Sequence, residues 1–233
     1  GFDELTGAEV IHAYGATETS PIVSLNRMKP SLMDTLSEDE RWNLKRFQGL
    51  VVVGVDVKIT DPLGELLPPG EENVGEIRLR GPWVTTSYAD NAEATEAGFD
   101  DEGYWRSGDL GYLSPEGYLK VTDRLKDVVK SGGEWISSID LENHIMTVPG
   151  VRDAAVIGVP HPQWEERPLA LVVRDEDSDV DQDAVLAALA ERFATWQLPD
   201  EVRFVTEIDR TGVGKVNKRK LRADYADALT SGR

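Results

Sequence analysis

Two unbroken apolar runs restrict the fold of this chain more than any other feature of its sequence. They cover residues 154–159 and 169–173, and no charged residue interrupts either of them. Strands of this kind are covered on both faces by other parts of the chain. An apolar stripe that includes Leu141 and Ile145 predicts a covering helix over residues 137–147. These patterns predict a compact α+β unit.

Further elements complete this carboxy-terminal unit. A second amphipathic helix is predicted over 184–194, a strand over 202–205, and a final helix over 218–229. Helices that flank short strands form a unit of ordinary domain size. Because the character of the sequence changes after Lys126, we place a domain boundary there.

The part before Lys126 reads as short strands separated by turns rich in glycine and proline. One long strand is expected over 48–59 and a short helix within 85–97. Ser37 followed by Glu40 predicts a capping box at the start of another helix. The predicted fold class is therefore α/β (mixed α+β). The end of a large domain, with a small β-barrel-like or meander sheet, covers residues 1–126, and a compact α+β domain covers 127–233.

Charge and composition exclude several classes of protein. Acidic residues outnumber Lys and Arg by 43 to 25, which gives a net charge of -18. A protein that binds the phosphate backbone needs the opposite sign, so nucleic-acid binding is not expected. No apolar run approaches the ~20 residues that cross a bilayer. The chain has no cysteine, which excludes disulfides and thiolate sites and is compatible with the cytoplasmic location that we expect.

Two charged residues are candidates for binding a sugar or a phosphate. Asp109 follows a glycine and precedes a strand, where its carboxylate can accept hydrogen bonds from the vicinal hydroxyls of a ribose. The alternative is an aspartate that caps its own turn. The guanidinium of Arg124 suits paired oxygen atoms, but it can equally form an ion pair with Asp123 or Asp127.

Lys215 lies between Gly214 and a basic run, where a mobile lysine can meet a developing negative charge. The alternative is an ordinary solvated loop lysine. The spacing does not match the phosphate-binding loop of nucleotide hydrolases.

A strand that leads into the hydroxyl-rich loop 14–21 is either an anion site or a capped turn. The histidines have no metal-ligand spacing and are expected to be structural: His12, His144 and His161.

Taken in order, these segments resemble the adenylate-forming superfamily of acyl-CoA synthetases, luciferases and the adenylation domains of peptide synthetases. The segments that carry the resemblance are Tyr14-Gly-Ala-Thr-Glu18, Gly75-Glu76, Arg106-Ser-Gly-Asp109, Asp123-Arg124-x-Lys126-Asp127, Ser131-Gly-Gly133 and Gly214-Lys215. Residues 117–143 and 154–173 read most like medium- or long-chain fatty acid–CoA ligases. The resemblance covers nearly the whole chain, but it is not specific for the length of the acyl chain.

The resemblance implies an AMP-forming acid–thiol ligase, which uses ATP, Mg²⁺, coenzyme A and a carboxylic, here fatty, acid. It also implies a role for each matching residue. Tyr14 and Gly15 would lie at the adenine, Thr17 at a phosphate and Glu18 at the Mg²⁺; Asp109 and Arg124 would bind the ribose; Lys215 would bridge the carboxylate and the α-phosphate; Lys126 would be a hinge; Ser131, Gly132 and Gly133 would line the tunnel for the pantetheine thiol.

The sequence also departs from the family pattern. The family's phosphate loop and the first half of its large domain have no counterpart, so the chain looks like a carboxy-terminal half whose amino-terminal half is missing, and we expect it to be inactive alone. Asp209-Arg210 replaces the usual proline before the catalytic lysine. The alternatives are a ligase for aryl or amino acids and a non-catalytic nucleotide-binding fragment that uses only Asp109 and Arg124. The sequence also leaves open whether the protein forms a homo-oligomer.

Overall fold

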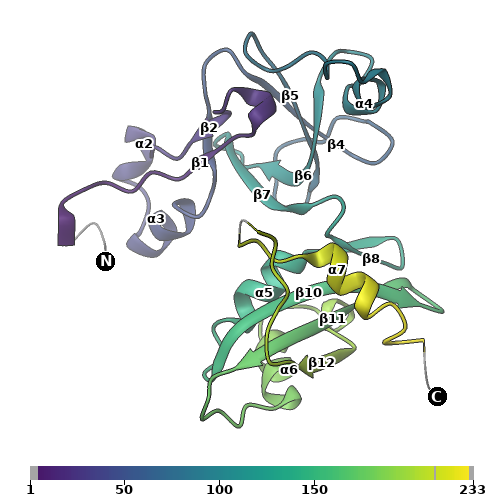
Figure 1. The fold of residues 1–233 in the computed structure, drawn as a ribbon. Coiled ribbons are helices and arrows are strands. Elements are labelled where there is room, and N and C mark those ends of the chain that lie inside the picture. The colour runs from purple at the N-terminus through teal and green to yellow at the C-terminus, as the bar shows by residue number, and fades with distance from the viewer. Residues whose placement is uncertain (1–4, 213, 231–233) are drawn as a thin grey trace. The chain divides into compact units, whose positions relative to one another are not determined.

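The computed structural model describes residues 5–212 and 214–230. The chain divides into two compact units, Gly1–Thr122 and Asp123–Arg233 (Figure 1). This division lies a few residues before the boundary predicted at Lys126. In the described part of the chain, no helix is both long and apolar enough to cross a membrane.

The first unit is built on a seven-stranded sheet with the order β1-β2-β3-β7-β6-β5-β4. Antiparallel pairing joins β1 to β2, β2 to β3, β3 to β7, β4 to β5 and β5 to β6. This order is an open path, so the described strands form a meander-like sheet and not a closed barrel. The strands are β1 (Ala13–Tyr14), β2 (Ser24–Leu25), β3 (Gly49–Val51), β4 (Asp56–Thr60), β5 (Gly75–Arg80), β6 (Trp105–Leu113) and β7 (Tyr118–Arg124).

Short helices connect these strands: η1 (Thr17–Thr19), α2 (Pro30–Met33), α3 (Glu38–Leu44) and α4 (Ala92–Gly98). The predicted capping box of α3 is confirmed, because Ser37 and Glu40 bond to each other's backbone N–H. The prediction of a single strand over 48–59 is wrong. Gly54 has φ of 100° and Val53 is 98% exposed, so the chain turns between β3 and β4.

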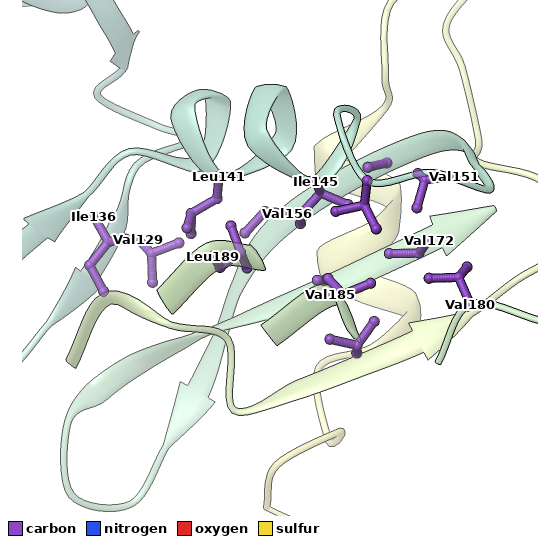
Figure 2. Packing of buried hydrophobic residues seen from close by; sticks show 14 residues of the cluster. Val129, Ile136, Leu141, Ile145, Val151, Val156, Val172, Val180, Val185 and Leu189 are labelled. Carbon is purple, nitrogen blue, oxygen red and sulfur yellow. The ribbon is translucent and has the colours of Figure 1, made fainter. Parts of the chain in front are cut away.

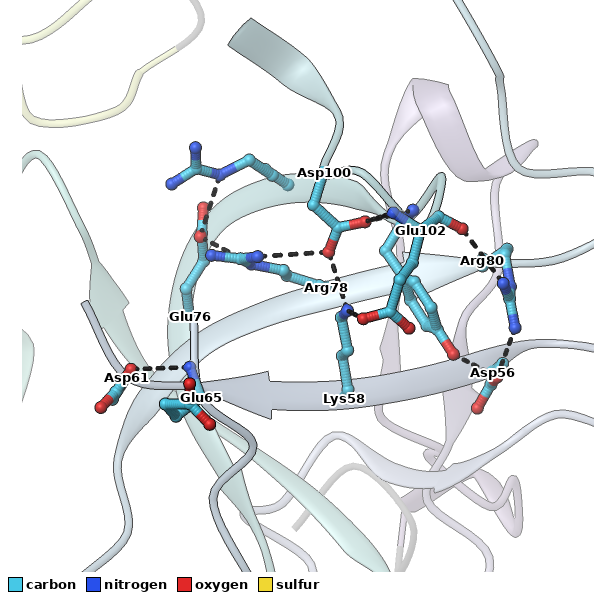
Figure 3. A network of polar contacts seen from close by, with 11 residues as sticks. Asp56, Lys58, Asp61, Glu65, Glu76, Arg78, Arg80, Asp100 and Glu102 are labelled. Atoms are coloured by element: carbon cyan, nitrogen blue, oxygen red, sulfur yellow. Dashed lines mark hydrogen bonds and ion pairs between the residues drawn. The ribbon is translucent and has the colours of Figure 1, made fainter. Parts of the chain in front are cut away.

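A network of charged side chains ties β4 and β5 to the loop before β6 (Figure 3). Asp100 lies between Lys58 at 2.8 Å and Arg78 at 3.2 Å. Burial alone would raise the pKa of Asp100, but hydrogen bonds from Lys58, the Tyr104 backbone and Arg78 outweigh it and lower the pKa to about 2. Arg78 also bonds to the buried Glu76. The loop is therefore held to the sheet by paired charges.

The second unit has a five-stranded sheet with the order β10-β11-β8-β9, in which β12 pairs in parallel with β11. The strands are β8 (Val129–Ser131), β9 (Glu134–Ile136), β10 (Val151–His161), β11 (Glu165–Arg174) and β12 (Glu201–Phe204). The helices are α5 (Ser138–Ile145), α6 (Gln182–Ala190), η2 (Thr195–Gln197) and α7 (Lys218–Asp224). The mixed α/β class predicted from the sequence is confirmed.

Both faces of the β10–β11 hairpin are buried, as the apolar runs predicted. Alternate side chains enter two separate cores, so that Val156 and Val172 face one core while Ile157 and Leu171 face the other. Figure 2 shows side chains of α5 and α6 packed against Val156 and Val172. Helix α7 contributes Leu221 to the other core.

A buried polar cluster joins α7 and α5 to the residue that follows the division between the units. Lys218, which is 9% exposed, donates to the Ser138 hydroxyl at 2.7 Å and pairs with Glu142 at 2.7 Å. Asp123, which is 1% exposed, accepts from the backbone N–H and the hydroxyl of Ser138 at 2.6 and 2.7 Å. Burial raises the pKa of the Glu142 carboxyl, and Lys218 opposes this shift.

We predict that Leu141→Ala lowers the free energy of unfolding of the second unit by about 2–5 kcal/mol, because a fully buried side chain leaves a cavity. Ile139→Ala on the same helix is the control, since Ile139 is 37% exposed and its loss should be much smaller. The stability of the second unit in both variants is measured from the protection of the β10 and β11 amides against hydrogen exchange. Equal losses would contradict the packing described.

We predict that Lys218→Met destabilises the second unit by about 3–5 kcal/mol near neutral pH, because it leaves buried carboxylates without their cation. Since the pKa of Glu142 is raised, protonation at lower pH removes part of this charge and the loss should shrink. The exposed Lys220 on the same helix, paired with Asp209 and Asp224, is the matched control. A Lys220→Met variant that lost as much stability would refute this account.

Candidate functional site

The loop that joins β1 to β2 closes tightly on itself. A Cβ atom on Gly15 would lie 1.5 Å from the Pro21 carbonyl oxygen, so only glycine fits at that position. The buried Thr19 hydroxyl accepts from the Ala16 N–H at 2.8 Å. These contacts hold the loop shut and leave Thr17 exposed on η1. The capped-turn alternative therefore describes the backbone of this loop, while Thr17 remains accessible to a ligand.

Two residues that the resemblance assigns to one nucleotide lie in contact. The Tyr14 hydroxyl donates to the Asp109 carboxylate, with 2.6 Å between Oη and Oδ2. Both side chains are half-buried. Because 95 residues separate them in the chain, the folded sheet is what brings these two motifs to one place.

An irregularity in β6 presents Asp109 at this position. Glu76 of β5 pairs with Leu110 and Arg78 pairs with Arg106, so Ile77 alone faces the three residues 107–109. Gly108 takes φ of 67°, and the Ser107 hydroxyl donates to the Ile77 carbonyl at 2.6 Å. Bulges of this kind redirect side chains beside functional sites. The Ser-Gly-Asp motif is therefore a strand bulge held to β5.

A hydrogen-bonded relay positions Glu18. The Trp105 Nε1–H donates to the Tyr88 hydroxyl at 3.0 Å, and that hydroxyl donates to the Glu18 carboxylate at 3.2 Å. The backbone of Glu18 also accepts from the Thr85 N–H at 2.7 Å. The carboxylate is half-buried and fixed from one side.

One fixed carboxylate suits Mg²⁺, which commonly takes one or two carboxylate oxygens and completes its shell with substrate phosphates and water. Among the described residues, no group of three or more His, Cys, Asp and Glu side chains is placed to hold a metal ion alone. Glu18 fits a Mg²⁺ ion that arrives with a nucleotide.

The remaining predicted residues belong to the second unit. Arg124 and Lys126 are exposed on a turn in which the Arg124 carbonyl accepts from the Asp127 and Val128 N–H groups, each at 2.8 Å. Asp109 and Arg124 belong to different compact units, so their shared grip on one ribose stays a prediction. The hinge role of Lys126 also stays a prediction.

The turn between β8 and β9 consists of Ser131, Gly132 and Gly133. Both glycines have positive φ, 61° and 89°, which favours glycine at each position. Ser131 is only 5% exposed, whereas Gly132 and Gly133 are exposed. The backbone of the glycines is therefore the accessible part of the turn.

Lys215 is exposed at the base of a tight turn. The Thr211 N–H donates to the Lys215 carbonyl at 2.7 Å, and an isolated bridge pairs Arg210 with Val216. The guanidinium of Arg210 donates to the Gly214 carbonyl at 3.0 Å and to the Asp153 carboxylate at 2.6 Å. Arg210, in the Asp209-Arg210 pair that stands where the family usually has a proline, therefore braces the turn.

Sequence reasoning assigned no role to Tyr88, Glu76 or Arg210. Tyr88 has no local pattern that marks it, because its partners Glu18 and Trp105 are distant in the chain. Glu76 belongs to the Gly75-Glu76 motif, and its carboxylate pairs with Arg106 at 3.2 Å, at the start of the bulged segment. Arg210 was visible only as a departure from the family pattern.

Comparisons with known proteins agree with this geometry. Residues 1–89 match the family described as AMP-binding enzyme, and residues 140–215 match the AMP-binding enzyme C-terminal domain. A long-chain-fatty-acid–CoA ligase of Thermus thermophilus is 46% identical over 95% of this chain and 41% of its own length. A 3-methylmercaptopropionyl-CoA ligase of Ruegeria lacuscaerulensis is 40% identical over 98% of this chain and 42% of its own length.

A solved structure gives the same result. The crystal structure of ATP-bound MatB from Rhodopseudomonas palustris superposes with a TM-score of 0.82 at 34% identity, over 98% of this chain and 43% of that one. The chain thus spans about two fifths of the length of these relatives. The matched regions contain Tyr14, the loop of Glu18 and the turn of Lys215, and the chain belongs to the AMP-binding, adenylate-forming enzymes.

Proposed function

We propose that the full-length protein is an AMP-forming ligase that joins a fatty acid to coenzyme A. The observation that carries the proposal is the 2.6 Å contact between Tyr14 and Asp109, in a chain that belongs to the adenylate-forming family. This contact places an aromatic ring beside a carboxylate, which are the two groups that recognise the base and the sugar of a nucleoside.

Nucleotide binding follows from the exposed groups around this contact. The ring of Tyr14 packs on the adenine beside Gly15. Asp109 accepts hydrogen bonds from the ribose hydroxyls, and the Arg124 guanidinium donates to the ribose oxygens. The exposed Thr17 hydroxyl donates to a phosphate oxygen. Glu18 provides a carboxylate oxygen for the Mg²⁺ that accompanies ATP.

In the first half-reaction, a carboxylate oxygen of the acid attacks the α-phosphorus of ATP. An acyl-adenylate forms as the bond to pyrophosphate breaks. Lys215 contacts the attacking carboxylate and the α-phosphate, and its ammonium group stabilises the charge that builds there. Bound Mg²⁺ supplies further neutralisation of the phosphate charge.

In the second half-reaction, the sulfur of coenzyme A attacks the acyl carbonyl and loses its proton, and AMP departs as the thioester forms. The proposal assigns the exposed backbone of the 131–133 turn to the path of the pantetheine thiol. A rotation at Lys126 exchanges Lys215 for this turn, so that one site serves two reactions.

The substrate class rests on the relatives. The Thermus thermophilus protein is named for long-chain fatty acids, and the Ruegeria lacuscaerulensis protein is named for a short thioether acid. We propose a fatty acid because residues 117–143 and 154–173 read like that branch. Aryl or amino acids are the alternative, and a cytoplasmic location is part of the same proposal.

The direct test uses the full-length product of the gene with ATP, Mg²⁺, coenzyme A and a panel of fatty, aryl and amino acids. We expect acyl-CoA, AMP and pyrophosphate in equal amounts, with the highest kcat/KM for a fatty acid. A higher kcat/KM for an aryl acid would show that the substrate is an aryl acid and not a fatty acid. Absence of AMP formation with every acid would overturn the proposed function.

We predict that Lys215→Ala in the full-length protein lowers the rate of adenylate formation by about 100-fold or more, because a preorganised charge at the reacting phosphate is lost. Transfer of the acyl group from a preformed acyl-adenylate to coenzyme A should stay near the wild-type rate. Arg219→Ala, an exposed cation on α7, is the control and should leave both half-reactions unchanged. Equal loss of both half-reactions in Lys215→Ala would refute the two-state assignment.

We predict that Tyr14→Phe in the full-length protein weakens ATP binding by about tenfold, because the ring remains while the hydrogen bond that orients Asp109 is lost. Tyr104→Phe is a matched control, since the Tyr104 hydroxyl forms the same kind of bond with Asp56 at 2.5 Å. Calorimetric titration with ATP should show unchanged affinity in that control. Equal effects of the two substitutions would show that the Tyr14 bond is only structural.

A further inference from the structure

The β10–β11 hairpin holds the turn of Ser131, Gly132 and Gly133 through bonds to Gly132 and to the preceding Lys130. The Lys130 N–H donates to the Glu166 carboxylate at 3.0 Å. The Gly132 N–H donates to the Trp164 carbonyl at 2.9 Å. These two bonds fix the backbone up to Gly132, although both glycines are exposed to solvent.

Arg167 of β11 is the central group behind this turn. Its side chain is buried, at 7% exposed, and its guanidinium donates in four directions. The acceptors are the Ser131 hydroxyl at 3.0 Å, the Asp200 carboxylate at 2.7 Å, the Trp196 carbonyl at 2.5 Å and the Leu198 carbonyl at 2.9 Å. A planar guanidinium can satisfy these acceptors together, which the point charge of a lysine cannot do.

The exposed side of the same turn borders a hollow of about 340 Å³. Its lining includes Gly132, Glu134, Trp164 and Trp196, and both tryptophans are nearly half exposed. A Cβ atom on Gly132 would lie 3.1 Å from the Trp164 ring, so the turn and the ring fit closely. Arg167 therefore connects the wall of this hollow, through Ser131, to the loop that carries Trp196 and Asp200.

We propose that Arg167 is a positioning residue for thioester formation, which holds the 131–133 turn in the place where the thiol of coenzyme A must pass. The inference rests on the proposed function, because it concerns the second half-reaction of that enzyme. Arg167 touches no reacting atom in this scheme. It acts through Ser131 and the backbone of the two glycines.

The test measures the two half-reactions separately in the full-length protein. Arg167→Gln removes the donor from all four acceptors, and we expect acyl transfer from a preformed acyl-adenylate to coenzyme A to fall by about tenfold or more, since small displacements of orienting groups can cost ~100-fold. Adenylate formation should stay within about twofold of wild type. For Arg167→Lys, a milder variant, the rate of acyl transfer should lie between the rates of wild type and Arg167→Gln.

Arg174→Gln is the matched control. Arg174 lies on the same strand, donates to the Val180 carbonyl at 2.7 Å and stacks on Phe204, and neither contact involves the 131–133 turn. The Arg174→Gln variant should leave the rates of both half-reactions unchanged. A readout independent of activity is hydrogen exchange at the Gly132 amide, which should become faster in Arg167→Gln and stay unchanged in Arg174→Gln.

The outcomes separate the inference from the function on which it rests. If the wild-type protein forms no acyl-CoA with any acid, the proposed function fails. If the wild type is active and Arg167→Gln and Arg167→Lys leave acyl transfer and Gly132 exchange unchanged, the role of Arg167 is overturned. Loss of both half-reactions in the folded Arg167→Lys variant would also overturn it, because that result indicates a general structural role.

Discussion

The second unit depends on one buried ammonium group. Lys218 supplies the positive charge between Glu142 and the Ser138–Asp123 pair, and all these groups are largely removed from water. A buried ion group is stable only when its charges are paired and its remaining hydrogen bonds are satisfied. The cluster satisfies both conditions, and it does so with residues from α5, α7 and the end of β7. Their relative placement within this unit is thus set by electrostatics as well as by the apolar cores.

This cluster also bears on the proposed function. Lys218 comes shortly after Lys215, and Asp123 directly precedes Arg124. Within the second unit, the turn that carries the proposed catalytic lysine and the segment that carries the proposed hinge are therefore tied to one buried group. The rotation proposed at Lys126 requires such internal stiffness.

Local patterns in the sequence predicted much of the fold. The β10–β11 hairpin, the stripe of Leu141 and Ile145, and the capping box of Ser37 and Glu40 all follow from residues close together in the chain. The strand expected over 48–59 failed because alternation of valines continued across Gly54, where the backbone turns. Alternation alone does not show where a strand stops.

The site was predictable only in part, since its contacts join distant segments. The motifs named Tyr14 and Asp109, but the bulge opposite Ile77 that brings Asp109 to Tyr14 depends on the register between β5 and β6. Tyr88 and Arg167 carry no local signal at all, because each acts through partners elsewhere in the chain. Pairings of this kind become visible only once the sheets are assembled.

The brace at Arg210 gives the turn of Lys215 a property that a proline would not. The ring of a proline restricts the backbone covalently and is indifferent to dissolved ions. The bond from Arg210 to Asp153 is a partly exposed ion pair, and counterions screen such pairs. We therefore expect the stiffness of the turn that presents Lys215 to fall as ionic strength rises.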